Sequence, residues 1–203
     1  MASEPILLPK VRLEALVDGV FAIAMTILVL ELKVPELVDR RSAAEMFRSL
    51  KHALPTLLAY FFSFGMLALF WVWHHRLAAK VARLDKALIA ISLGFLSLVS
   101  FFPFAAALLG RYPVNAGSLA VYMPVVGGIL LCQVAFFGHA RRRGLVEPMV
   151  TIEDSLLVHR RNLKGALIFT LWAVPSLVRL GWVWALVPFL LAVLLAVAMK
   201  RAR

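Results

Sequence analysis

Six apolar runs alternate with short polar segments along the chain. Each is close to the roughly 20 helical residues that a hydrocarbon core about 30 Å thick requires. The predicted spans are residues 13–32, 54–74, 87–109, 119–137, 163–178 and 181–199. The fifth run is shorter than the others and contains Pro175. The pattern predicts an all-α polytopic membrane protein with six transmembrane helices.

The composition agrees with this pattern and excludes an ordinary soluble domain. Hydrophobic residues make up 63% of the 203 positions, charged residues only 16%, and the mean hydropathy is +0.90. Soluble domains are about half apolar and a quarter charged, so this chain has too few polar groups to cover a surface that faces water. The connections at 33–50 and 140–162 are too short for a core of their own. We therefore expect residues 1–203 to form one transmembrane domain.

The basic residues lie between the apolar runs and predict the topology. With six spans, fifteen of the 22 Lys and Arg residues fall on the side of the two termini and seven on the other. Because cytoplasmic loops are enriched in Lys and Arg, both termini are expected in the cytoplasm. Residues 1–12 lack an apolar region followed by a cleavage site, so no cleaved signal peptide is expected. The net charge of +11 comes without a recognition motif, so nucleic-acid binding is not expected.

The sequence carries no enzymatic motif, so neither a catalytic site nor a cofactor is expected. A Ser/His/Asp set, an HExxH motif, a glycine-rich phosphate loop and a CxxC pair are all absent. His74 and His75 are adjacent, and neighbouring side chains on a helix point about 100° apart, so this pair alone should not chelate a metal. Cys132 is the only cysteine and lies in an apolar run, where it is expected to fill space. The tryptophans, Trp71 among them, lie mostly near span ends and are expected to anchor the interface.

The first span contains an ionisable residue and two distinct faces. Asp18 should face protein or water, because a charged group in lipid is costly, although a position near the inner interface would let water solvate it. At about 100° per residue, one face contains the set Gly19, Ile23, Thr26, Ile27 and Leu30, and Asp18 lies on another with Ala22 and Met25. An apolar stripe of this kind is usually lipid-facing or core, so periodicity alone does not identify a pore.

Several separated motifs resemble one membrane-protein family. The first span reads Arg12…Asp18-Gly-Val-Phe-Ala-Ile23 and continues with Thr26…Leu30-Glu31. The end of the second span reads Trp71-Val-Trp-His-His-Arg-Leu77, and Asp85 and Pro103-Phe104 follow it. In this order the motifs resemble the transmembrane protein 175 family of endosomal, lysosomal and prokaryotic potassium channels. The motifs cover about the first half of the chain, and the six-span length agrees with the rest.

The resemblance implies a homotetrameric potassium channel in a prokaryotic plasma membrane, surrounded by lipid, with K⁺ as the permeant ion. The family lacks the Thr-Val-Gly-Tyr-Gly filter of ordinary potassium channels, and that string is absent here too. The family's first helix lines a central pore, with a hydrophobic constriction at positions matching Ile23, Ile27 and Leu30. The matching Thr26 would add a ring of hydroxyls. Such a constriction can close by dewetting, and hydroxyl oxygens can replace part of a cation's hydration shell.

The resemblance also implies a polar scaffold that holds the first helix against its neighbours. Its members here would be Arg12, Asp18, His74 and Ser92. This chain has Leu16-Val17 where the family usually has Phe-Ser, and Ser92 where it usually has Asn. Both changes remove hydrogen-bonding capacity. Leu16-Val17 lacks the serine hydroxyl, and at position 92 a hydroxyl reaches less far than an amide.

Two further functions remain open from the sequence. Asp18 and His74 could form the titrating pair of a proton-coupled secondary transporter, although two related halves with broken helices, the usual pointer to alternating access, are not evident. The departures at Leu16-Val17 and Ser92 would also suit a non-conducting structural membrane protein.

Overall fold

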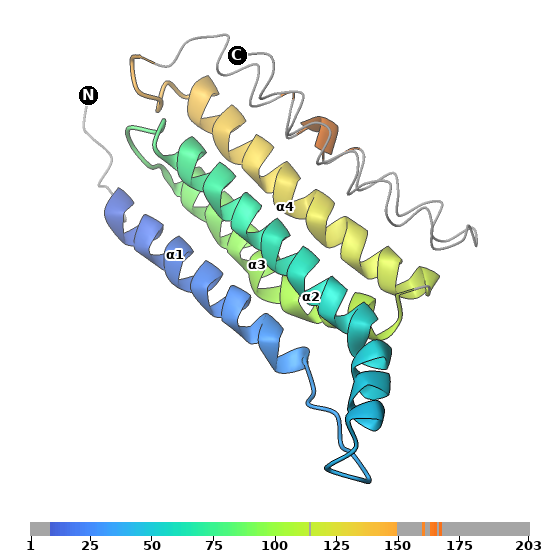
Figure 1. Ribbon diagram of the computed structural model, residues 1–203. Helices are drawn as coiled ribbons and strands as arrows, with labels where there is room; N and C mark the ends of the chain where they lie inside the picture. The colour runs from blue at the N-terminus through green and yellow to red at the C-terminus, as the bar shows by residue number, and fades with distance from the viewer. Residues whose placement is uncertain (1–8, 114, 150–159, 161–162, 166, 168–203) are drawn as a thin grey trace.

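The computed structural model describes residues 9–113, 115–149, 160, 163–165 and 167. Four long helices dominate this part of the chain: α1 (Lys10–Ile27), α2 (Ala43–Ala78), α3 (Lys86–Arg111) and α4 (Ala116–Arg142). A short 3₁₀ helix, η1 (Leu28–Glu31), continues α1. Helix α1 lies on one side of the α2–α3 pair and α4 lies on the other side (Figure 1). Within these residues the fold is all helical, as predicted, and the only β pairing is one isolated bridge between Val81 and Val146.

All four helices are long and apolar enough to cross a bilayer, which confirms the first four predicted spans. The candidate spans are Lys10–Glu31, Ala43–Ala78, Lys86–Arg111 and Ala116–Arg142. The predicted fifth span, 163–178, lies outside the described residues except at 163–165 and 167, and the predicted sixth, 181–199, lies wholly outside them. The six-span count and the cytoplasmic location of both termini therefore stay predictions.

Helix α2 begins eleven residues before the predicted start at Leu54. Ser42 caps it by accepting a hydrogen bond from the Glu45 backbone N–H, at 3.2 Å. The Glu45 carboxylate in turn accepts from the backbone N–H groups of Val38 (2.9 Å) and Asp39 (3.1 Å), which fixes the loop before the helix. These capping contacts start a helix in a polar segment, where hydropathy gives no signal.

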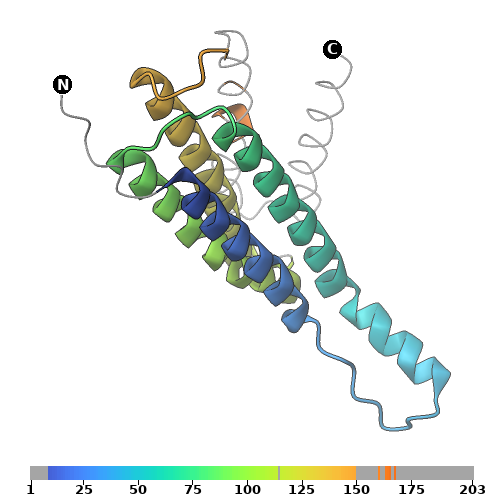
Figure 2. The same cartoon turned by 90° about the vertical axis from the view of Figure 1, so that its left-hand side faces the viewer.

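The extra turns of α2 project beyond the other helices (Figure 2). Its 36 residues make the helix about 54 Å long at 1.5 Å per residue, well over the roughly 30 Å of the hydrocarbon core. Pro55 lies inside α2, and the N-terminal part of this helix bends away from the rest (Figure 1). Proline removes a backbone donor and crowds the preceding turn, which accounts for the bend.

Helices α3 and α4 begin at side-chain caps. The Asp85 carboxylate caps α3 by accepting from the Leu88 N–H at 2.8 Å, and the Asn115 side chain caps α4 by accepting from the Gly117 N–H at 2.7 Å. Helix α4 ends at Arg142, and Gly144 two residues later has a left-handed φ of 64°, which favours glycine. The polypeptide then turns back toward the α2–α3 loop.

A continuous apolar core joins the helices, and aromatic side chains fill its centre. The Phe102 ring lies 6.2 Å from Phe70 and 5.3 Å from Tyr122, so it connects α3 to both α2 and α4. The Phe21 ring lies 5.7 Å from Phe95 and connects α1 to α3. These side chains are essentially buried, so they set the position of α1 against the rest of the bundle.

Candidate functional site

Helix α1 presents two different faces. Its buried face points toward α2 and α3 and consists of Leu13, Val17, Phe21 and Ala24, with Leu28 of η1 in line. On the opposite side, the other described residues leave a face of α1 uncovered that is called the α1 stripe below. It consists of Gly19, Ile23, Thr26, Ile27 and Leu30. The exposed fractions on this stripe are 60% for Ile23, 42% for Ile27 and 74% for Leu30. The face that helical arithmetic singled out thus lies within the surface of α1 and η1 that the other described helices leave uncovered, a surface that also includes Asp18, Ala22 and Val29.

The Thr26 hydroxyl has a defined orientation on that stripe. It donates to the backbone carbonyls of Ala22 (3.0 Å) and Ile23 (2.9 Å). A hydroxyl has one hydrogen and two acceptor lone pairs. Because the hydrogen points back into the helix, the lone pairs are left toward the uncovered side, where they could accept a hydrogen bond or ligate a cation.

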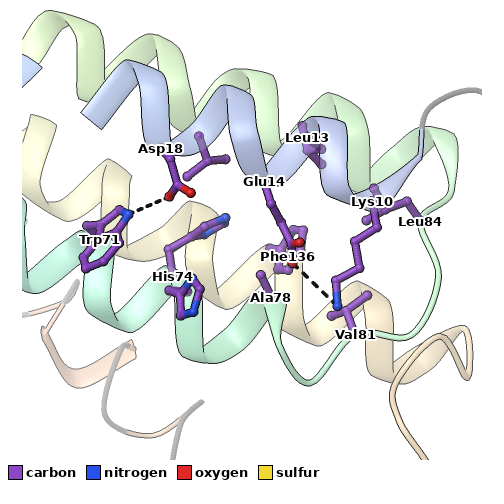
Figure 3. Close-up of a pocket in the computed structure, with 12 residues that line it drawn as sticks. Lys10, Leu13, Glu14, Asp18, Trp71, His74, Ala78, Val81, Leu84 and Phe136 are labelled. Carbon is purple, nitrogen blue, oxygen red and sulfur yellow. Dashed lines mark hydrogen bonds and ion pairs between the residues drawn. The ribbon is translucent and has the colours of Figure 1, made fainter. Parts of the chain in front are cut away.

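A cleft of about 410 Å³, counted with its open mouth, separates the first half of α1 from the end of α2 (Figure 3). Its polar wall is formed by Lys10, Glu14, Asp18, Trp71, His74 and His75. Asp18 Oδ1 accepts a hydrogen bond from the Trp71 indole N–H at 2.7 Å, which ties α1 to α2. Sequence reasoning placed Trp71 only at the interface and missed this bond.

His74 lies at the inner wall of the cleft. It is only 4% exposed, and its ring stacks on Phe95 with centroids 4.5 Å apart and the planes 18° from parallel. Phe136 of α4 packs against it at 5.3 Å. Within the described part of the chain, Nδ1 of this ring has no hydrogen-bond partner.

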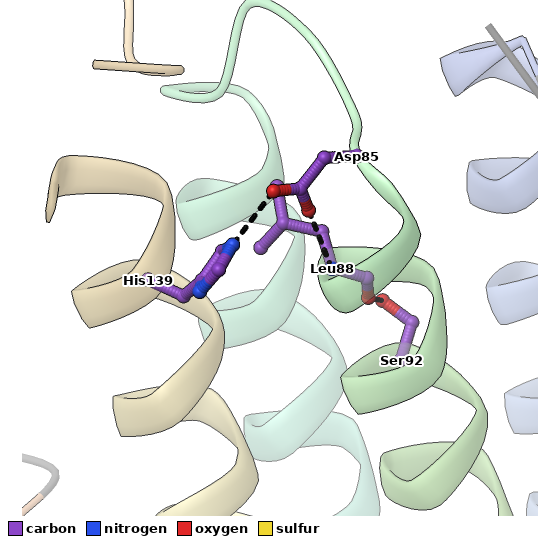
Figure 4. Close-up of polar contacts among 4 residues, drawn as sticks. All are labelled: Asp85, Leu88, Ser92 and His139. Carbon is purple, nitrogen blue, oxygen red and sulfur yellow. Dashed lines mark hydrogen bonds and ion pairs between the residues drawn. The ribbon is translucent and has the colours of Figure 1, made fainter. Parts of the chain in front are cut away.

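The other two predicted scaffold residues lie apart from this contact. The Ser92 hydroxyl is buried and donates to the Leu88 carbonyl of its own helix at 2.8 Å (Figure 4). Arg12 is exposed on α1, and its side chain forms no ion pair with another described residue. The structure therefore brings Asp18 and His74 to one cleft, and the four-residue network as a whole stays a prediction.

A second polar contact joins α3 to α4 at the end of the bundle near the start of α1 (Figure 4). His139 Nε2 lies 2.7 Å from Asp85 Oδ2, while Asp85 Oδ1 accepts from the Leu88 N–H. Partial burial raises the pKa of Asp85, but hydrogen bonds from His139 and Leu88 and attraction from Arg143 outweigh it and hold that pKa below its usual value. The sequence carries no local signal for this pair, because its members are 54 positions apart.

Comparisons with known proteins agree on one family. A model of the Endosomal/lysosomal potassium channel TMEM175 family matches residues 12–103. A potassium channel of Streptomyces collinus is 35% identical over 165 residues, which cover 77% of either chain. The endosomal/lysosomal proton channel TMEM175 of Gallus gallus is 42% identical over 102 residues, which cover 46% of this chain and 20% of that protein.

A solved structure extends the similarity over nearly the whole fold. The crystal structure of a lysosomal potassium-selective channel TMEM175 homolog from Chamaesiphon minutus superposes with a TM-score of 0.79 at 30% identity. The superposition covers 93% of this chain and 97% of that one. This chain is a multi-pass membrane protein that belongs to the Endosomal/lysosomal potassium channel TMEM175 family.

Proposed function

We propose that this protein is a potassium-permeable channel whose subunits assemble as a homotetramer around a pore lined by α1. The bacterial relatives in Streptomyces collinus and Chamaesiphon minutus carry the name potassium channel, and a channel of this kind has no enzymatic role. The observation that carries the pore assignment is the α1 stripe. It combines exposed apolar side chains with one outward hydroxyl on a face of α1 that the other described helices leave uncovered.

The stripe has the chemistry of a gate. Four copies of Ile23, Ile27 and Leu30 around one axis would form a hydrophobic constriction that closes by dewetting. Four copies of Thr26 would present oxygen lone pairs to a cation that has lost part of its water, because each hydroxyl hydrogen is held by its own helix. This arrangement favours cations and permits opening by a modest widening at Ile23.

The scaffold of Arg12, Asp18, His74 and Ser92 would hold this stripe in register. The bond between Asp18 and Trp71 supports that role, since it fixes α1 to α2 a little over one helical turn before Ile23. A charge in a membrane helix needs a partner, and here the indole N–H supplies one.

We place the channel in a prokaryotic plasma membrane as a single six-helix domain, residues 1–203, with both termini in the cytoplasm. Four described helices supply the first four spans. The basic residues at the ends of α2 and α4 support a cytoplasmic position for those ends, because Lys and Arg are enriched in cytoplasmic loops.

Flux measurements on reconstituted protein test the pore assignment. Liposomes loaded with K⁺ should release it, and Ile23→Asn should raise the rate because a polar side chain wets the constriction. The matched control is Leu58→Asn on α2, since Leu58 is 61% exposed against 60% for Ile23. A control that leaks as fast as Ile23→Asn, or no flux from any variant, would contradict the proposal, and the mass of the solubilised complex tests for four subunits.

Proton-coupled transport is the second candidate, favoured by one observation. Asp18 and His74 line the same cleft, and His74 Nδ1 lacks a partner among the described residues, as a proton-exchanging site would need. Flux that saturates with substrate and follows a pH gradient, and that Asp18→Asn abolishes, would favour the transporter. The absence of flux under both protocols would leave a non-conducting structural membrane protein.

A further inference from the structure

One end of the bundle gathers a dense group of positive side chains. It is called the basic end patch below and consists of Arg83, Lys86, Arg141, Arg142 and Arg143. All five side chains are exposed, and none of them is in an ion pair with another described residue. Their charges are therefore available to a partner outside the fold.

Backbone contacts hold the two contributing segments together. The Ala82 N–H donates to the Leu145 carbonyl at 2.8 Å, and the Glu147 N–H donates to the Lys80 carbonyl at 2.9 Å. The isolated bridge between Val81 and Val146 lies between these bonds, with Val81 fully buried. The loop before α3 and the exit from α4 thus form one fixed surface, so a partner need not order them.

The charge on this surface is strongly unbalanced. The only carboxylates within residues 80–86 and 139–147 are Asp85 and Glu147. Asp85 is already engaged by His139 at 2.7 Å and by the Leu88 N–H. Five exposed cations consequently face one free carboxylate.

The position of the patch along the helices places it at lipid headgroups. Helix α3 has 26 residues and α4 has 27, so each is about 40 Å long and extends from the hydrocarbon core into the headgroup region. Lys86 opens α3, and Arg141 and Arg142 close α4. Their side chains therefore reach the level of the lipid phosphates.

The arrangement of the side chains favours binding to an extended anionic surface over binding to a single small anion. Arg141 and Arg142 are consecutive in a helix and point about 100° apart, so they diverge. Arg143 lies toward Asp85, where its charge acts on that carboxylate. We propose that the basic end patch binds several anionic phospholipid headgroups at once, with the arginine forks on lipid phosphates.

Lipid titrations of the purified full-length protein test this binding. In a neutral detergent, phosphatidylglycerol should raise the thermal unfolding midpoint, since a ligand of the native state stabilises it, and phosphatidylcholine should not. The triple variant R141Q/R142Q/R143Q should need about a hundredfold more phosphatidylglycerol for the same rise, from about fivefold per basic residue. The control R40Q/R41Q/R48Q removes the same charge at the other end of the bundle and should stay within about twofold.

Four outcomes would overturn the inference. Equal protection by phosphatidylcholine would remove the charge selectivity, and equal protection by inorganic phosphate would assign the patch to a free anion. An equal loss in both triple variants would show that net charge alone is responsible. If the R141Q/R142Q/R143Q variant does not fold, R83Q/K86Q replaces it with an expected shift of about 25-fold, and a shift under twofold in that variant contradicts the proposal.

Discussion

His139 near the end of α4 donates from Nε2 to Asp85 Oδ2 at 2.7 Å, and the same Asp85 side chain caps the first turn of α3. The ionised carboxylate can only accept, so the imidazole N–H must be the donor. One side chain thus starts a helix and fastens it to the neighbouring helix. This contact also lies under the basic end patch and keeps its two segments apposed.

Substitutions at Asp85 should separate its two roles. Asp85→Asn keeps an oxygen for the Leu88 N–H and loses the charge that faces His139, whereas Asp85→Ala loses both. We expect Asp85→Ala to lower the free energy of unfolding by about 1 kcal/mol more than Asp85→Asn does. Thermal midpoints in detergent measure this order, and Asn115→Ala, which removes the α4 cap, is the matched control. Equal midpoints for the two Asp85 variants would contradict the capping role.

Acid should weaken the same contact. The pKa of Asp85 is lowered from 3.8 in the folded protein, so its contribution to stability is present in full above that value and is lost as the pH falls through the depressed folded pKa. The stability difference between the wild type and Asp85→Asn should therefore shrink as the pH is lowered below about 4. Unfolding midpoints of both proteins measured across that range test the sign. A gap that widens in acid would mean that the carboxylate is not held ionised by its partners.

Asp18 and Trp71 should be energetically coupled. Trp71→Phe removes the indole N–H but keeps an aromatic ring beside His75, and Asp18→Asn removes the charge. Hydrogen bonds between helices in membranes are worth about 0.6 kcal/mol on average and more when one partner is charged, so we expect a coupling of about 1 kcal/mol. A double-mutant cycle on unfolding in mixed micelles measures it directly. Additive effects of the two substitutions would show that the bond does not hold α1.

Tyr122 lies at the centre of the α2–α3–α4 contact and combines a polar and an apolar role. Its hydroxyl lies 3.3 Å from the Ser63 hydroxyl, and its ring packs against Phe102 and Phe62. Tyr122→Phe should cost only about 0.6 kcal/mol, because it removes one long hydrogen bond. Tyr122→Leu should cost about 2 kcal/mol or more, because it leaves a cavity among the aromatic rings. Unfolding titrations of both variants test this order, and a reversal would show that the hydroxyl pair stabilises the bundle more than the ring packing does.

The sequence predicts most of the described fold because the bilayer imposes a simple length and polarity rule. Three of the four described spans begin and end within a few residues of the apolar runs. The start of α2 is the exception, since Ser42 and Glu45 begin the helix in a segment that precedes the predicted apolar run at 54–74. Capping is local chemistry, and the Ser-x-x-Glu spacing was the signal that could have found it.

The candidate site is predictable only in part. The residues that form the α1 stripe follow from the 100° spacing of a helix, because this spacing puts Ile23, Thr26 and Ile27 on the same side however the helix packs. The bond between Asp18 and Trp71 does not follow, since it depends on which face of α2 meets α1. That choice depends on packing throughout the shared apolar core, in which Phe21 of α1 and Phe70 of α2 both lie, and it is not encoded locally.

Thr26 provides the sharpest test of the proposed ion path. Thr26→Val has nearly the same shape but no oxygen, so a cation at that level would lose about 1.4 kcal/mol of ligation and the K⁺ flux should fall about tenfold. Thr26→Ser keeps the oxygen and loses only the methyl group, so it should retain most of the flux. Tracer flux in K⁺-loaded liposomes at matched protein density measures both. If the valine variant conducts as well as the serine variant, the hydroxyl lone pairs do not contact the ion, and the conduction path must be sought away from the α1 stripe.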